Sequence, residues 1–236
     1  PIPVLFQNAP DALNGIIFTV IRRIISQLNT QLALVNKIPD SINSILEEPV
    51  ESAQETPEYT VATFYSISNC QPGLKNISFG NLLIKQVTQK LQREFPSIKK
   101  FVTLSPVSGF KRWLQHSDAN ESTELTALKA DFAESNPGPE ELTERSENLR
   151  KLVFNYLTQA KKGKYPSDPV SRFHLGNGAK LHNVHANADP SEKGLQQSYG
   201  CMVNYLYDLR YIERNHERYV TEGKVDCSDK LKSLLV

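Results

Sequence analysis

A serine, a histidine and two tyrosines are the side chains whose type and setting suggest chemistry. Ser105 follows the apolar run 101–104 and precedes a proline, and His174 lies between two apolar residues in F-H-L. Tyr205 and Tyr207 are two residues apart in a predicted strand, so their side chains are expected on one face. Hydroxyl and imidazole groups can hold a reacting group by hydrogen bonds and transfer a proton to it.

Each of these residues also has an ordinary structural explanation. Serine before proline is common in turns, a histidine between apolar residues is often a hydrogen-bonded core residue, and tyrosines on one strand face commonly pack in a core. Ser105 is not part of a G-x-S-x-G elbow, which argues against a hydrolase. His182 and His185 lack the spacing of metal ligands on a helix, and no cysteine or carboxylate cluster accompanies them, so the sequence does not favour a zinc site.

The segment from Gln71 to Asn81 is a second candidate for chemistry. It reads Q-P-G-L-K-N-I-S-F-G-N and stands between a predicted strand and a predicted helix. A helix N-terminus presents unpaired N–H groups and a positive dipole end, and Gly73, Gly80 and Ser78 allow close approach and capping. The segment therefore predicts a phosphate site. An ordinary strand-to-helix connection is the alternative, since neither G-K-[ST] nor G-x-G-x-x-G is present.

Hydrophobic patterning predicts an α/β fold around that turn. Residues 59–68 are rich in β-branched and aromatic residues, the next apolar positions follow helical spacing from Asn81 to just before Pro96, and 101–104 forms a short strand. A strand, a helix and a second strand in this order are typical of a parallel or mixed sheet with a crossover helix. Further strands are predicted at 30–35, 180–185 and 202–206.

The remaining segments are predicted to be helical or irregular. The pattern favours a helix at 13–28, although a strand fits there too, and a short helix at 41–46. Polar residues with prolines predict an exposed loop at 47–58. Further helices are predicted to start at 110 and to run from about 140 to 161, followed by loops at 161–169 and 187–194 and a charged, partly helical tail at 213–236.

Composition restricts the class of protein. The chain has 236 residues, 39% of them hydrophobic and 22% charged, which fits one large or two small globular domains. A net charge of +1 gives no general attraction for nucleic acid, and the apolar stretches fall short of the about 20 residues that a membrane span needs. We therefore expect neither a nucleic-acid nor a membrane partner. Three cysteines without C-x-x-C spacing favour buried thiols in a reducing compartment.

Five separated motifs resemble the malonyl-CoA decarboxylase family. They are F-Y-S-I-S-N-C-Q-P-G-L-K-N-I-S-F-G-N-L-L-I-K-Q-V, L-Q-R-E-F-P, T-L-S-P-V-S-G-F-K-R-W-L, D-P-V-S-R-F-H-L-G-N-G-A and S-E-K-G-L-Q-Q-S-Y-G-C-M-V-N-Y-L-Y-D. They occur in the family's order and cover most of Tyr59–Asp208. Agreement of five motifs is more specific than any one of them, while the insertion with N-P-G-P and both ends of the chain are only weakly characteristic.

The resemblance implies the fold of the GNAT acetyltransferase superfamily, an α/β (α+β) fold. Its mixed central sheet is flanked by helices, with a helical insertion expected around 115–165. It also implies one catalytic domain over residues 1–236. Residues 1–30 are expected to be a remnant of, or a connection to, the helical domain that the family uses for oligomerisation. A homo-oligomer is therefore expected for the full-length protein.

The resemblance further implies the residues of an active site. The family's catalytic serine corresponds to Ser105, its catalytic histidine to His174, and its N-Y-x-Y tyrosines to Tyr205 and Tyr207, without a choice between the two. Its coenzyme A loop corresponds to the predicted phosphate turn, and the residues implied are Gln71, Gly73, Leu74, Ile77, Ser78, Phe79, Gly80 and Asn81.

The reaction implied is the conversion of malonyl-CoA to acetyl-CoA and carbon dioxide through an enolate. His174 is expected to protonate the enolate and Ser105 to orient the carboxylate, and the reverse division is left open. No metal and no organic cofactor are expected, since coenzyme A is part of the substrate. A GNAT-type acyltransferase and a non-catalytic acyl-CoA-binding module are the alternative functions. The expected compartment is the cytoplasm, with the mitochondrion or another organelle as the alternative.

Overall fold

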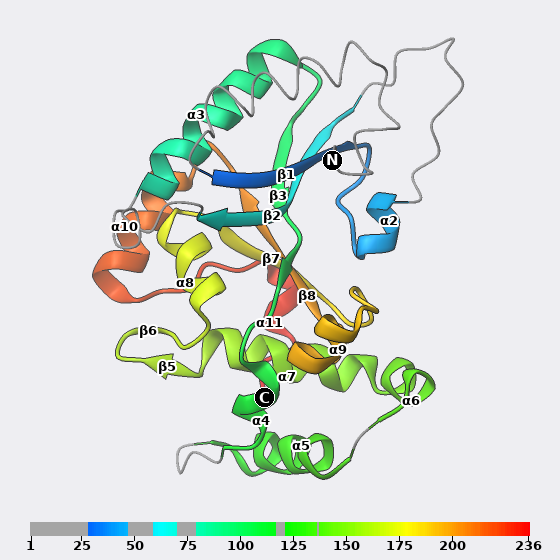
Figure 1. Cartoon of the computed structure of the whole chain (residues 1–236). Helices are drawn as coiled ribbons and strands as arrows, with labels where there is room; N and C mark the ends of the chain where they lie inside the picture. Colours follow the sequence, from blue (N-terminus) through cyan, green and yellow to red (C-terminus); the bar gives the residue numbers. More distant parts are fainter. Residues whose placement is uncertain (1–27, 47–58, 70–78, 117–120, 136) are drawn as a thin grey trace. The chain divides into compact units, whose positions relative to one another are not determined.

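The structure, a computed structural model, describes residues 28–46, 59–69, 79–116, 121–135 and 137–236 (Figure 1). The chain forms two compact units. Among the described residues, the first comprises those up to Leu104 together with Tyr207–Leu209, and the second comprises those within Ser105–Leu206 and Arg210–Val236. The predicted helix at 13–28, the predicted loop at 47–58 and most of the predicted phosphate turn lie outside the described residues.

The first unit contains a three-stranded mixed sheet and one long helix. β1 (Leu28–Val35) pairs antiparallel with β2 (Val61–Asn69), and β2 pairs parallel with β3 (Lys100–Thr103). The two parallel strands are connected through α3 (Phe79–Glu94), as a parallel pair requires a crossover (Figure 1). The short helix α2 (Ile42–Leu46) follows β1. The predicted order of strand, helix and strand is confirmed.

Burial explains why these segments take these forms. The side chains of Val61, Ala62, Thr63 and Phe64 are all buried in β2, as are Phe101, Val102 and Thr103 in β3. Such continuous burial is typical of strands that are covered on both faces. On α3 the buried Val87 and Leu91 are four residues apart and share one helix face, and the helix ends before Pro96.

One strand of the second unit pairs antiparallel with a strand on each of its two sides. β7 (Lys180–His185) and the very short β4 (Ser105–Pro106) both pair with β8 (Met202–Tyr207). Val203 is opposite Ser105 on one side and Val184 on the other, so β4 and β7 lie on opposite edges of β8. Together with the first unit, these strands and their flanking helices confirm the predicted α/β class.

Helices make up most of the second unit. The segment between β4 and β7 is mainly helical, which confirms the predicted insertion. A two-stranded hairpin, β5 (Lys161–Lys162) with β6 (Tyr165–Pro166), interrupts it. The helices are α4 (Phe110–Leu114), α5 (Thr123–Glu134), α6 (Pro139–Glu144), α7 (Ser146–Thr158), α8 (Pro169–Gly176), α9 (Glu192–Ser198), α10 (Ile212–Glu222) and α11 (Asp229–Lys232).

Three predictions about this unit are wrong in detail. The helix expected from 140 to 161 is two helices, because the backbone leaves helical geometry at Arg145 (φ −93°, ψ 13°). The loop expected at 161–169 contains the hairpin and the first residue of α8, and the loop expected at 187–194 contains the start of α9. In these places a cap or a two-residue strand pair fixes the backbone, and periodicity does not detect such short features.

Within the ranges that the structure describes, no helix combines the length and the apolar character needed to cross a bilayer.

Candidate active site

Ser105 lies at a strand edge with its side chain in the interior. It begins β4, where its backbone is opposite Val203 of β8, and only 6% of the residue is exposed. The proline that follows limits β4 to two residues. The serine hydroxyl is therefore fixed by sheet pairing at a point where the chain leaves the sheet.

His174 is carried by α8, a helix that local sequence signals establish. Asp168 is the N-cap, and its Oδ2 accepts a hydrogen bond of 2.6 Å from the backbone N–H of Ser171. Pro169 occupies the first turn, where its missing N–H costs nothing. These signals place His174 in the last turn, with 3% of the residue exposed.

The structure brings Ser105, His174 and Tyr205 together. Ser105 Oγ lies 3.2 Å from His174 Nε2, a hydrogen bond between residues 69 apart in the sequence. The Tyr205 ring of β8 stacks on the imidazole with centroids 4.6 Å apart and planes 23° apart, and Phe173 packs against the imidazole edge-on at 5.1 Å. We call Ser105, His174 and Tyr205 the Ser–His centre.

Burial determines the charge of the histidine. It lowers the pKa of His174 from 6.5 to about 3, because the protonated imidazole is poorly solvated in the interior. The imidazole of the free protein is therefore neutral near pH 7, with one ring nitrogen donating and the other accepting. The donor in the Ser105–His174 hydrogen bond depends on the tautomer.

The loop after His174 is held by α10, which lies beside α8 in Figure 1. Asn215 Nδ2 donates to the carbonyl of Gly178 at 3.2 Å, and His216 Nδ1 lies 2.6 Å from the carbonyl oxygen of Gly176. Gly178 has φ +80°, and a Cβ there would stand 2.2 Å from the carbonyl oxygen of Ile212. Only glycine fits this close approach, so Gly178 of the G-N-G turn is needed for the loop after α8 to pack against α10.

The loop after Ser105 is fixed in a similar way. The Tyr156 hydroxyl of α7 donates a 2.7 Å hydrogen bond to the carbonyl of Ser108. Gly109 follows with φ +78°, and a Cβ at this position would stand 3.0 Å from the same hydroxyl. The S-P-V-S-G-F motif thus contains both the serine of the Ser–His centre and a turn that packs against the Tyr156 hydroxyl.

The other predicted site residues belong to the first unit or lie outside the described residues. Tyr207 belongs to the first unit, where it is buried, and burial holds its pKa well above the usual value of a tyrosine. Phe79, Gly80 and Asn81 form the first turn of α3. The other predicted coenzyme A residues lie outside the described residues, namely Gln71, Gly73, Leu74, Ile77 and Ser78.

Among the residues that the structure describes, no group of three histidine, cysteine, aspartate or glutamate side chains is placed to hold a metal ion.

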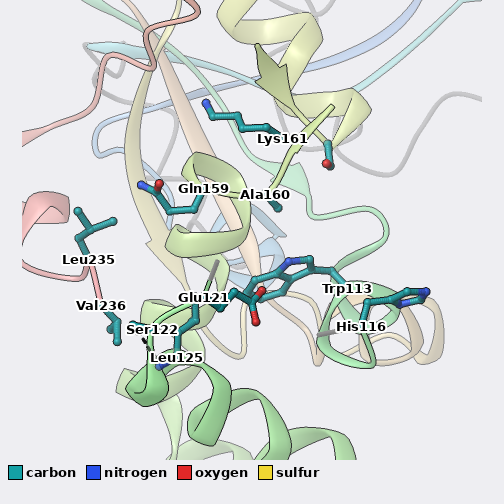
Figure 2. A pocket seen from close by; sticks show the side chains of 11 residues that line it. Trp113, His116, Glu121, Ser122, Leu125, Gln159, Ala160, Lys161, Leu235 and Val236 are labelled. Carbon is teal, nitrogen blue, oxygen red and sulfur yellow. Dashed lines mark hydrogen bonds between the residues drawn. The ribbon is translucent and has the colours of Figure 1, made fainter. Parts of the chain in front are cut away.

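A cavity of about 540 Å³ lies in the second unit, which also contains the Ser–His centre (Figure 2). Its wall includes none of the residues of the Ser–His centre. Figure 2 shows the Trp113 indole at its edge and side chains from several segments around it. The lining residues are Trp113, His116, Glu121, Ser122, Leu125, Gln159, Ala160, Lys161, Ser167, Leu235 and Val236.

Sequence reasoning missed two residues that hold the site together. Asp168 caps α8, and Tyr156 anchors the loop after Ser105. The Asp-Pro pair at 168–169 is a recognisable helix start, so the cap could have been found. Tyr156 has no such signal, because its partner lies 48 residues away in the sequence.

Comparisons with known proteins give one consistent result. Residues 27–236 match the family model described as the malonyl-CoA decarboxylase C-terminal domain. The chain is 33% identical over 231 residues to the mitochondrial malonyl-CoA decarboxylase of Anser anser anser, covering 86% of this chain and 46% of that protein. It is 34% identical over 234 residues to the Rattus norvegicus enzyme of the same name, covering 86% and 47%. The chain thus spans about half the length of these curated relatives.

Solved structures agree. Malonyl-CoA decarboxylase from Rhodopseudomonas palustris superposes with a TM-score of 0.74 at 36% identity, over 89% of this chain and 50% of that one. The enzyme from Agrobacterium vitis gives a TM-score of 0.72 at 39% identity, over 89% of this chain and 53% of that one.

Proposed function

Because the chain belongs to the malonyl-CoA decarboxylase family, we propose that it converts malonyl-CoA to acetyl-CoA and carbon dioxide. The observation that carries this proposal is the buried 3.2 Å contact between Ser105 Oγ and His174 Nε2, with Tyr205 stacked on the imidazole. The match of residues 27–236 to one family domain supports a single catalytic domain that includes both compact units.

The chemistry requires a stabilised enolate and one proton. When the bond between the α-carbon and the carboxylate breaks, carbon dioxide leaves and its electron pair passes into the thioester as an enolate. One proton, drawn ultimately from solvent, then forms the methyl group of acetyl-CoA. Donors preorganised at the developing oxyanion are worth about 3–4 kcal/mol each, and general-acid delivery of the proton about 100- to 10,000-fold in rate.

His174 is suited to both tasks because it starts neutral. Burial that lowers its pKa to about 3 keeps a fixed positive charge out of the empty site. A bound carboxylate, and then an enolate, raises the pKa of the imidazole by placing negative charge beside it. His174 can therefore donate a hydrogen bond to the enolate oxygen and hold the proton that goes to the α-carbon.

Ser105 and Tyr205 complete the arrangement. The Ser105 hydroxyl donates to the substrate carboxylate and turns the breaking bond out of the thioester plane, so that its electrons overlap with the carbonyl. Tyr205 holds the imidazole plane through the 4.6 Å stack. The opposite division, with Ser105 at the enolate and His174 at the carboxylate, uses the same atoms. Neither division needs a covalent acyl-enzyme.

The remaining features of the proposal concern binding. The turn from Gln71 to Asn81 would receive the coenzyme A pyrophosphate on backbone N–H groups at the start of α3.

No metal or organic cofactor is required, because the thioester carbonyl is itself the electron sink. Dialysis against a chelator should therefore leave the rate unchanged. The full-length protein is proposed to be a homo-oligomer, which light scattering measures.

One assay tests the function. Purified protein is mixed with malonyl-CoA in the absence of any acceptor, and acetyl-CoA and carbon dioxide are followed together. We expect turnover by the wild type, a fall of about 100- to 10,000-fold in His174→Ala, and an unchanged rate in His116→Ala, which removes an exposed histidine outside the Ser–His centre.

The other outcomes separate the alternatives. No turnover by the wild type, or an unchanged rate in His174→Ala, would overturn the proposal. Acetyl transfer that depends on an added amine or thiol would indicate an acyltransferase. Malonyl-CoA binding without any turnover would indicate a binding module.

A further inference from the structure

Asp168 is a buried carboxylate that the reaction outlined above does not use. The residue has no exposed surface, although it stands in the turn that begins α8. Its Oδ2 accepts the Ser171 N–H at 2.6 Å. Its Oδ1 is buried and has no hydrogen-bond partner among the described residues. The backbone amides of Val170 and Ser108 nevertheless lie close enough to lower the pKa of the carboxyl group.

The two sets of amides belong to different functional segments. Val170 and Ser171 lie in the first turn of α8, whose last turn carries His174. Ser108 lies in the loop three residues after Ser105, and its carbonyl is already fixed by the Tyr156 hydroxyl. One carboxylate thus attracts the segment that bears the serine and the helix that bears the histidine.

Charged and titratable neighbours favour an ionised carboxylate here. The Arg172 guanidinium on α8 lowers the pKa of Asp168, and its Nη1 is held by the carbonyls of Pro166 and Ser167 at 2.8 Å each. The Tyr156 hydroxyl on α7 also faces Asp168 and stays protonated, because burial and the nearby carboxylate raise its pKa.

We propose that Asp168 is a positioning residue, whose negative charge draws the loop after Ser105 and the start of α8 together and so sets the Ser105–His174 contact. This inference rests on the proposed decarboxylation. A carboxylate is favoured over a serine or an asparagine as the cap of this helix, because a neutral cap would satisfy Ser171 but would attract the amide of Ser108 more weakly than a negative charge does.

The proposal predicts a pH dependence of the rate that a residue acting only as a helix cap would not produce. Burial raises the pKa of Asp168 from 3.8 to about 6, against the opposing effects of the amides and Arg172. Above that pH the charge is present, and below it the charge and the attraction are lost. The value of kcat/KM, whose pH dependence reports groups of the free enzyme, should therefore fall as the pH drops through about 6, and we call this fall the acid limb. In the free enzyme His174, with its pKa near 3, cannot produce this limb.

Steady-state kinetics of Asp168→Asn with malonyl-CoA test the idea. We expect kcat at pH 7.5 to fall about 10- to 100-fold through misplacement of the pair, KM to stay nearly unchanged, and the limb near pH 6 to disappear. Ser191→Ala is the matched control. It removes the side chain that caps α9 at 3.1 Å, so it should lower the melting temperature yet leave both kcat and the limb unchanged. Wild-type kcat with the limb retained in Asp168→Asn would overturn the proposal.

A second variant covers the case in which Asp168→Asn does not fold. Arg172→Gln removes the cation that favours the carboxylate, so the limb should move to higher pH. A limb that does not move would contradict the proposal.

A measurement without turnover separates this inference from the proposed function. The ring nitrogens of His174, followed by ¹⁵N NMR from pH 5 to pH 8, should report a transition near pH 6 in the wild type and none in Asp168→Asn. The transition without any decarboxylation would refute the function alone. A transition that persists in Asp168→Asn would refute the positioning role.

Discussion

The Ser–His centre and the cavity beside Trp113 lie in one compact unit, and they differ in the charge of their buried polar groups. The centre holds a neutral side chain, whereas the cavity wall includes one member of a buried ion pair. In the centre, the imidazole has lost its charge to burial and contacts a hydroxyl and an aromatic ring. At the cavity, Lys129 Nζ is 2.6 Å from Glu121 Oε1 and 4.2 Å from the centroid of the Trp113 ring, with 4% of the lysine side chain exposed.

This difference in charge suggests that the Ser–His centre serves the reaction, whereas the ion pair at the cavity serves the stability of the fold. A neutral imidazole contributes little to holding the fold, but it can take up charge when an anionic substrate arrives. An ion pair that also packs on an aromatic ring already makes its interactions in the protein without substrate, so it contributes to stability. Breaking the pair leaves a buried, unpaired charge. Substitutions in the centre should therefore change the rate with little effect on stability, and those at the cavity the reverse.

Of three effects that test this comparison, the largest is expected at Ser105. Ser105→Ala should lower kcat about 100- to 1,000-fold, because one preorganised donor is lost. The free energy of unfolding should change by no more than about 1.5 kcal/mol, the net value of a hydrogen bond. Initial rates and urea unfolding of the same preparation measure both. A large loss of stability with the rate retained would reverse the comparison.

An intermediate effect is expected at the cavity. Glu121→Gln should reduce the free energy of unfolding by about 2–3 kcal/mol, since Lys129 loses its anion while the amide oxygen still accepts a hydrogen bond. The kcat should not change. Glu147→Gln is the matched control, because Glu147 is 59% exposed in its pair with Arg150 and should cost no more than about 0.5 kcal/mol. Equal losses in the two variants, or a reduced kcat in Glu121→Gln, would show that the two regions are not independent.

The third effect is the smallest for a change of one pH unit, and it tests the neutral imidazole of the Ser–His centre. His174 titrates at about 3 in the folded protein and near 6.5 when unfolded, so the unfolded chain binds the extra proton between these values. Wild-type stability from this group is complete above pH 6.5 and is lost as the pH falls, by at most about 1.4 kcal/mol per pH unit.

His174→Gln lacks that loss, so its stability relative to the wild type should improve as the pH falls from 6.5 toward 4. Urea unfolding at several pH values measures the trend. Leu125→Ala removes an untitratable side chain from the cavity wall, and its difference from the wild type should not vary with pH. The same constant difference in His174→Gln would rule out a buried neutral imidazole.

The order of the first-unit elements was predictable from the sequence because each has a strong local signal. β-branched residues mark β2, helical spacing marks α3 and Pro96 marks its end. The second unit was harder to predict. The sequence pattern predicts no helix where the eight residues of α8 lie, and it does not separate α5 from the rest of the expected helical insertion. Short helices depend on caps and packing more than on periodicity.

The sequence by itself determined which residues are present: a serine before a proline, a histidine in F-H-L and the tyrosines of N-Y-L-Y, in motifs specific enough to indicate a family. Only the tertiary structure decided that Ser105 and His174 are hydrogen-bonded across 69 residues, that the imidazole is neutral, and that the Asp168 carboxylate is buried where it caps α8. The reason is physical. Side-chain identity is a local property, whereas a contact, a pKa and a buried charge depend on which distant atoms fold around a group and exclude water from it.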